Sequence, residues 1–142
     1  MNSFHKPVLL QETITGLRVE KNKKYIDATL GGGGHAEQIL KLGGEVLGID
    51  ADQEAISYVE EKVKSLASRR SGQKSKVKIW ERLKLARGNF RDIGAIARLN
   101  RFDKVAGIIF DLGVSSHQIE TPARGFSFQN EGPLDMRMDQ EL

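Results

Sequence analysis

The sequence contains no cysteine, and no apolar run in it approaches the length that crosses a bilayer. The lack of cysteine excludes a disulfide framework and zinc sites built from thiolates, and it fits the reducing cytosol. The N-terminal residues lack the pattern of a secretory signal and the Arg-rich, Ser-rich composition of an organelle transit peptide. We therefore expect a cytoplasmic protein without a membrane segment, and we identify no metal site in the sequence.

The 142 residues, 39% hydrophobic and 29% charged, suit one soluble domain with a modest core. Helical spacing of apolar residues indicates helices over 7–17, 35–42, 52–66 and 91–99, and β-rich runs indicate strands over 24–30, 45–50, within 77–86 and over 104–111. The last strand is continuously apolar, which is typical of a strand buried on both faces of a parallel sheet. This order predicts an α/β fold with a doubly wound parallel sheet. Four strands followed by a long loop would make a lopsided sheet, so we expect the chain to be truncated before its C-terminal strands.

A glycine-rich turn follows the first predicted strand. Gly31, Gly33 and Ala36 match the pattern G-x-G-x-x-[G/A] at the start of a helix. Asp50 follows Gly31 by 19 positions and ends the second strand, where a carboxylate can accept hydrogen bonds from both ribose hydroxyls. These residues predict an adenosine-containing cofactor at the carboxyl ends of the strands. A dinucleotide and S-adenosylmethionine both fit, and only the dinucleotide needs the helix N-terminus for its pyrophosphate.

Seven short segments carry a family resemblance. They are HKPVLLQE (5–12), DATLGGGGHA (27–36), LGIDAD (47–52), GNF (88–90), GIIFDLGVSSHQIE (107–120), RGFSF (124–128) and GPLDMRMD (132–139). Together they resemble the MraW (RsmH) family, whose members use S-adenosylmethionine to methylate the exocyclic N4 of a cytidine in the decoding centre of small-subunit ribosomal RNA. The resemblance runs from His5 to Asp139, and members of the family are considerably longer than this chain.

The resemblance implies a Rossmann-like methyltransferase fold and a division of the chain. Residues 1–111 would form the N-terminal part of the S-adenosylmethionine-binding domain, and residues 112–142 would form a loop and the start of an inserted helical substrate region. The implied cofactor contacts are Gly33, Gly34 and His35 for the methionine part, Asp50 for the ribose, Phe90 for the adenine, and Asp111 and Gln118 for the remainder. The alternative role of Phe90 is core packing, and that of His35 is a capping or solvent-exposed position. Without the resemblance, Gln118 would be interpreted as a solvated loop amide.

The amino group of cytosine is a poor nucleophile, because its lone pair is delocalised into the ring. An enzyme must align this group with the methyl donor and accept hydrogen bonds from its N–H groups. In many amino methyltransferases the fourth strand is followed by the motif Asp/Asn/Ser-Pro-Pro-aromatic. Here Asp111 matches the first position of this motif, and the Pro-Pro-aromatic part is missing. We predict Asp111 as the catalytic acceptor, with a pure cofactor contact as its alternative role. Phe126 and Phe128 are candidates to stack on the base or, alternatively, to pack the loop against the domain.

Positive charge is concentrated in the middle of the chain, although the net charge is only +3. The basic residues between positions 69 and 91 are Arg69, Arg70, Lys74, Lys76, Lys78, Arg82, Lys84, Arg87 and Arg91, against Glu81 and Asp92. Such a cluster can attract RNA phosphate, or it can be a solvated loop without a partner. Arg124 and Arg137 could hold phosphate or pair with Asp135 and Asp139, and for Arg137 we favour the ion pair.

These observations predict an S-adenosylmethionine-dependent cytosine-N4 methyltransferase that acts on the RNA of the small ribosomal subunit. Two other functions are compatible with some of the same residues. An NAD-dependent oxidoreductase would also use the glycine turn and Asp50, but it leaves the segment 111–139 unexplained. A non-catalytic RNA-binding fragment would use the basic segment and transfer nothing.

Overall fold

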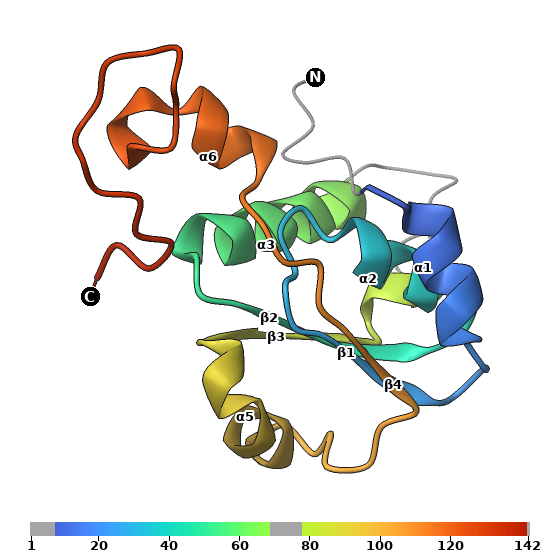
Figure 1. The fold of residues 1–142 in the computed structure, drawn as a ribbon. Coiled ribbons are helices and arrows are strands. Elements are labelled where there is room, and N and C mark those ends of the chain that lie inside the picture. The colour runs from blue at the N-terminus through green and yellow to red at the C-terminus, as the bar shows by residue number, and fades with distance from the viewer. Residues whose placement is uncertain (1–7, 69–77, 142) are drawn as a thin grey trace.

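The computed structural model describes residues 8–68 and 78–141. Its elements are, in chain order, α1 (Leu10–Leu17), β1 (Lys24–Asp27), α2 (Gly34–Lys41), β2 (Glu45–Asp50), α3 (Gln53–Ser68), β3 (Leu83–Arg87), the 3₁₀ helix η1 (Phe90–Asp92), α5 (Ile93–Leu99), β4 (Gly107–Ile109), α6 (Ser116–Glu120) and the 3₁₀ helix η2 (Pro122–Arg124). The segment from α6 onward extends past the N-terminal end of α3 (Figure 1).

The strands form one parallel sheet in the order β3-β2-β1-β4. Tyr25 in β1 pairs with Val46 of β2 on one side and with Gly107 of β4 on the other. Figure 1 shows α1, α2 and α3 on one face of the sheet and α5 on the opposite face. This arrangement confirms the predicted doubly wound α/β fold.

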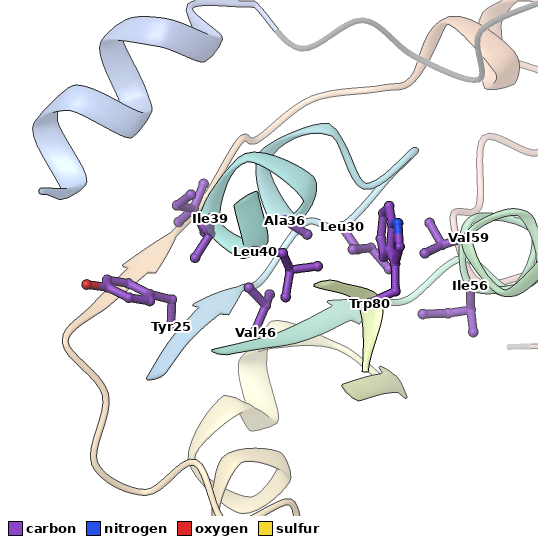
Figure 2. Packing of buried hydrophobic residues seen from close by; sticks show 10 residues of the cluster. Tyr25, Leu30, Ala36, Ile39, Leu40, Val46, Ile56, Val59 and Trp80 are labelled. Carbon is purple, nitrogen blue, oxygen red and sulfur yellow. The ribbon is translucent and has the colours of Figure 1, made fainter. Parts of the chain in front are cut away.

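Successive side chains of a strand point to opposite faces, so the sheet supplies two apolar clusters. Tyr25 and Val46 belong to the cluster on the face of α2 and α3, which Figure 2 shows. Their neighbours Ile26 and Leu47 belong to the cluster on the face of α5. Because helices cover both faces, β1 and β2 are buried along almost their whole length.

The prediction of a strand over 104–111 that is buried on both faces is wrong in both its length and its burial. β4 covers only Gly107–Ile109, and Ile108 and Phe110 expose 43% and 49% of their surface. The reason is the position of this strand, which lies at an edge of the described sheet and pairs with β1 alone. The cluster beside α5 contains Ile26 and Leu47 from the two central strands and does not extend to Ile108.

The other elements lie close to their predicted bounds. The third strand is β3, at the other edge of the sheet, and residues 78–80 before it are helical. The helix predicted over 91–99 begins as η1, where the side chain of Asn89 accepts a hydrogen bond from the N–H of Arg91 at 2.9 Å. The predicted start of the first helix, at Pro7, lies outside the described residues.

Two further findings concern the described residues only. None of their helices is long and apolar enough to cross a membrane. Nor do three or more of their His, Asp or Glu side chains form a group that could hold a metal ion.

Candidate active site

The carboxyl ends of β1, β2 and β4 meet at a cavity of about 200 Å³. Six of the seven residues that were predicted to contact the cofactor line this cavity: Gly34, His35, Asp50, Phe90, Asp111 and Gln118. The fold therefore brings together residues that are spread over more than half of the chain. Cofactor sites of doubly wound sheets lie at this edge.

The seventh predicted residue, Gly33, does not line the cavity. Its backbone has φ +74° and serves as the N-cap of α2. A Cβ at this position would lie 3.2 Å from Cγ2 of Val59, so the residue faces α3. Gly33 thus shapes the turn, because both its conformation and its close approach to α3 favour glycine.

Asp50 holds the glycine turn in place. Its Oδ2 accepts a hydrogen bond from the backbone N–H of Gly31 at 2.8 Å, and its Oδ1 accepts one from the N–H of Asp52 at 2.9 Å. Burial raises the pKa of this carboxyl, and the two N–H donors work in the opposite direction. Each carboxylate oxygen has a second lone pair, so the group can still accept hydrogen bonds from a ligand.

The side chains of His35 and Asp111 both line the cavity and lie close to each other. His35 Nδ1 is 3.9 Å from Asp111 Oδ2, and the histidine is almost fully buried, which excludes the solvent-exposed alternative. The backbone N–H of Asp111 donates to Thr29 Oγ1 at 2.7 Å. This bond fixes the start of the loop after β4 against the end of β1, and it leaves the Asp111 carboxylate partly exposed at the cavity.

Phe90 is not a core residue, because 41% of its surface is exposed. Its ring meets the ring of Phe110 edge-on, with centroids 5.7 Å apart and planes at 90°. The two rings come from the segments after β3 and β4, which are the two edge strands. Phe90 therefore offers an aromatic surface at the cavity in a defined orientation.

Gln118 is buried and its amide is hydrogen-bonded within the protein, which excludes the solvated-amide alternative. Its Oε1 accepts from the N–H of Ser115 at 2.9 Å, and its own N–H donates to Ser115 Oγ at 3.1 Å. This reciprocal capping box starts α6. The Nε2 atom donates to Asp52 Oδ2 at 2.8 Å, so the amide also ties α6 to the N-terminus of α3.

Two buried acidic residues, one lining the cavity and one beside it, were not assigned to ligand binding by the sequence analysis. Asp27, at the end of β1, is completely buried. Burial raises the pKa of its carboxyl to about 7, and the hydrogen bond from the N–H of Thr29 acts in the opposite direction. Asp52 is also buried, and its Oδ1 accepts a hydrogen bond from the N–H of Glu54 at 3.0 Å, which caps α3. The signal that could have marked Asp52 is its spacing of two residues from Asp50 in LGIDAD.

The prediction for Arg124 is wrong. Its guanidinium is buried and pairs with Asp52 at 2.8 Å and with Glu54, so it can neither hold phosphate nor pair with Asp135 or Asp139. Asp52 and Glu54 lie at the N-terminal end of α3, 72 and 70 residues earlier in the sequence, and the arginine side chain is only 2% exposed. For Arg137 the favoured ion pair is confirmed, since its Nε lies 2.5 Å from Asp135 Oδ1.

The described part of the basic segment is largely engaged within the protein. Arg82 donates to the carbonyl of Leu40 at 2.6 Å, and Lys84 donates to the carbonyl of Asn100 at 2.8 Å. Arg87 pairs with Asp139 and Glu141. The predicted contributors Arg69, Arg70, Lys74 and Lys76 lie outside the described residues. A role of this segment in RNA binding therefore stays a prediction.

Comparison with known proteins places this chain in a family. The sequence model of the MraW methylase family matches residues 2–142. The chain is 46% identical over 143 residues to the ribosomal RNA small subunit methyltransferase H of Halothermothrix orenii, a match that covers 97% of this chain and 42% of that protein. It is also 46% identical to the protein of the same name from Thermomicrobium roseum, with 98% and 40% covered. The chain thus spans about two-fifths of the length of these curated relatives.

Solved structures show the same fold. The C-terminal domain of precorrin-6Y C5,15-methyltransferase from Rhodobacter capsulatus matches with a TM-score of 0.54 and 15% identity, over 75% of this chain and 50% of that chain. A putative rRNA methylase from Clostridium thermocellum matches with a TM-score of 0.54 and 21% identity, over 78% and 53%. At these identities the likeness concerns the fold alone, that of Rossmann-like methyltransferases. The match along almost the entire sequence confirms the resemblance, and the chain belongs to the MraW methylase family.

Proposed function

We propose that this chain forms the S-adenosylmethionine-binding part of an enzyme that methylates the exocyclic N4 of a cytidine in small-subunit ribosomal RNA, near the decoding centre. The observation that carries the proposal is the cavity at the strand ends, where Asp50, Phe90 and Asp111 converge. Residues 1–111 would hold the cofactor, and residues 112–142 would close one side of its site and begin the substrate region.

The charge of the cavity favours S-adenosylmethionine over NAD. The lining residues include Asp50, Asp52 and Asp111. No lysine or arginine of the described part of the chain lines the cavity. Asp52 is paired with Arg124, whereas neither Asp50 nor Asp111 forms an ion pair with a described lysine or arginine. A sulfonium is attracted by such carboxylates, and the pyrophosphate of a dinucleotide is repelled.

The residues present fit the groups of the cofactor. Asp50 has lone pairs left for ribose hydroxyls, and Phe90 has an exposed ring for a purine. Gly34 and His35 would hold the methionine part, and Gln118 and Asp111 would supply the remaining contacts. When bound, S-adenosylmethionine supplies a methyl group on a positively charged sulfur.

Asp111 is the residue placed to act on the substrate. Its carboxylate is partly exposed at the cavity, at the end of the strand where the amino group of the target base would arrive. By accepting a hydrogen bond from that amino group, Asp111 would orient the nitrogen and favour its tetrahedral form. Orientation of this kind can lower the activation barrier of a bimolecular reaction by up to roughly 7–11 kcal/mol.

The RNA would present the base outside a helix, since an enzyme that acts on a base must unstack it. Phe128 is completely exposed and Phe126 is half-buried, so Phe128 is the better placed of the two to stack on RNA. A ribosomal substrate implies a cytoplasmic enzyme whose partner is the small ribosomal subunit.

The proposal is tested by transfer of a radiolabelled methyl group to small ribosomal subunits that lack the mark, with the protein at its full natural length. We expect incorporation at one cytidine, and Asp111→Asn should lower the rate about 100-fold or more while changing S-adenosylmethionine affinity far less. A wild-type protein that binds RNA but incorporates no label would favour the non-catalytic alternative. Calorimetry with both cofactors separates the remaining alternative, since heat with NAD and none with S-adenosylmethionine would identify an oxidoreductase.

A further inference from the structure

The segment 112–138 supplies one wall of the cofactor cavity, through residues 112–115, Gln118 and Met138. Except for the short helices α6 and η2, this segment has no regular secondary structure. Several of its large apolar side chains, including Leu134 and Phe128, are fully exposed, so apolar burial does little to hold it in place. Something else must fix this wall against the domain.

We propose that Arg124 is a positioning residue, which builds this wall of the cofactor site by docking the segment 112–138 on the N-terminus of α3. The proposal rests on the proposed function, because it concerns the same cofactor site. Arg124 itself does not line the cavity, and it acts through Asp52, Gln118 and the backbone near Met138.

The guanidinium of Arg124 joins three parts of the chain. One of its nitrogens lies 2.8 Å from Asp52 Oδ2, and the other pairs with Glu54 in the first turn of α3. The first nitrogen also lies 3.3 Å and 3.2 Å from the carbonyl oxygens of Arg137 and Met138. This nitrogen, Nη2, has two N–H groups for these three acceptors, so two of them share one N–H, while Nη1 serves Glu54. A lysine has a single nitrogen and cannot span the same set of acceptors.

Asp52 connects Arg124 to two residues that line the cavity, Gln118 and Asp50. Asp52 Oδ2 accepts a hydrogen bond from Arg124, and it accepts a second one from Nε2 of Gln118 at 2.8 Å. The backbone N–H of Asp52 donates to Oδ1 of Asp50, the predicted ribose-binding carboxylate. The side chains of Arg124 and Asp52 are only 2% and 4% exposed. Removing Arg124 would leave the Asp52 carboxylate buried without its cation, and a buried charge without a partner is strongly unfavourable.

The contacts of Arg124 converge on the cavity wall and not on either apolar cluster of the sheet. Loss of Arg124 should therefore loosen the wall while the strands stay folded. A cofactor that touches both Asp50 and the wall binds the docked segment better than the undocked one. By linkage, cofactor binding and docking must strengthen each other.

The first test is affinity for S-adenosylhomocysteine, measured by calorimetry on the protein at its full natural length. We expect Arg124→Met to weaken binding by about tenfold or more, the loss that follows when charge-assisted hydrogen bonds are removed. Arg124→Lys should be intermediate, since it keeps the charge without the fork. Arg137→Met is the matched control, because this arginine lies in the same segment with 49% of its side chain exposed, and its change should stay below about twofold.

The second test is hydrogen exchange, with and without S-adenosylhomocysteine. In the wild type, the amides of 112–138 should gain protection when the ligand binds. In Arg124→Met these amides should exchange faster than in the wild type in both states, while the amides of β1 and β2 stay protected. A purely stabilising arginine would instead lower the protection of the strands together with that of the segment. If Arg124→Met loses strand protection, Arg124→Lys is judged by the same criteria.

The proposal is overturned if the folded variant binds within about twofold of the wild type, or if its segment stays protected. Failure of the proposed function has a different signature, since the wild type itself would then not bind S-adenosylhomocysteine. In that case the exchange of 112–138 in the ligand-free proteins still decides whether Arg124 docks the segment.

Discussion

The carboxylate of Asp50 accepts a hydrogen bond from the backbone N–H of Gly31, with 2.8 Å between Oδ2 and the nitrogen. The residue predicted to bind the ribose is thus also the residue that holds the glycine turn. A ligand at this carboxylate therefore meets a turn whose position is already set. Such preorganisation reduces the ordering that binding would otherwise require.

Asp50→Ala should weaken S-adenosylmethionine binding about 10- to 100-fold, because it removes a charged acceptor of two ribose hydroxyls and frees the turn. Asp50→Asn keeps one acceptor oxygen and should lose less. Calorimetry on both variants checks this, with the exposed Asp92→Asn as the control. Equal affinities of Asp50→Ala and the wild type would contradict the assignment of the ribose site.

Phe90→Leu should weaken S-adenosylmethionine binding by about two- to tenfold, which is the usual contribution of one aromatic contact. Phe110→Leu should have a smaller effect in the same direction, since Phe110 only orients the Phe90 ring. Phe128→Leu serves as the control, because that ring is fully exposed and does not line the cavity. If Phe128→Leu weakened cofactor binding as much as Phe90→Leu, the adenine site would be misplaced.

Asp27 should make stability depend on pH. Burial raises the pKa of its carboxyl to about 7 in the folded protein, from an ordinary value of 3.8. Between these values the folded state keeps a proton that the unfolded state has released, so stability falls as the pH rises from about 4 to about 7. Above about pH 7 the carboxyl is ionised in both states, and this loss stays constant.

Asp27→Asn removes this titration. The unfolding free energy of the wild type, relative to Asp27→Asn, should therefore decrease by up to about 4 kcal/mol between pH 4 and pH 7. Urea unfolding at a series of pH values measures the difference, and Glu60→Gln on the exposed side of α3 controls for general effects of pH. A difference between wild type and Asp27→Asn that did not change with pH would show that Asp27 does not titrate in this range.

Gly125→Ala should undock the segment that forms the cavity wall. Gly125 has φ +76°, and a Cβ there would lie 2.3 Å from the carbonyl oxygen of Pro133. The left-handed conformation alone costs an alanine about 1–2 kcal/mol, and the contact adds to it. Hydrogen exchange of 122–138 should accelerate. Gly16→Ala is the control, since nothing lies within 4 Å of a Cβ on this exposed helix position and alanine favours helix.

The order of the elements and the place of the site could be predicted from the sequence. Apolar periodicity identifies helices and strands locally, and the right-handed connections of parallel strands leave few arrangements. The turn at Gly31 follows β1 and Asp50 is the last residue of β2, so the carboxyl edge of the sheet had to bring them together. The structure confirms both the sheet and the convergence of these residues on one cavity.

Local pattern could not predict which strand lies at an edge or which charge is buried. Ile108 and Ile109 are equally apolar, yet only Ile109 is buried, because pairing and helix packing decide which face is covered. Arg124 has acidic residues nearby in the sequence, but it pairs with Asp52, 72 residues away. Burial and partner choice depend on the surroundings of a side chain in space, which no spacing along the chain encodes.

The sequence by itself determined the strand and helix order, the glycine turn, the carboxylate at Asp50 and the family, because these depend on short segments and on general rules of chain connection. Only the tertiary structure decided that Asp27 is enclosed, that Gln118 is held by Asp52 and that Arg124 points inward. The physical reason is that removal from water is a property of the packed whole, and it sets the pKa of a carboxyl and the strength of an ion pair.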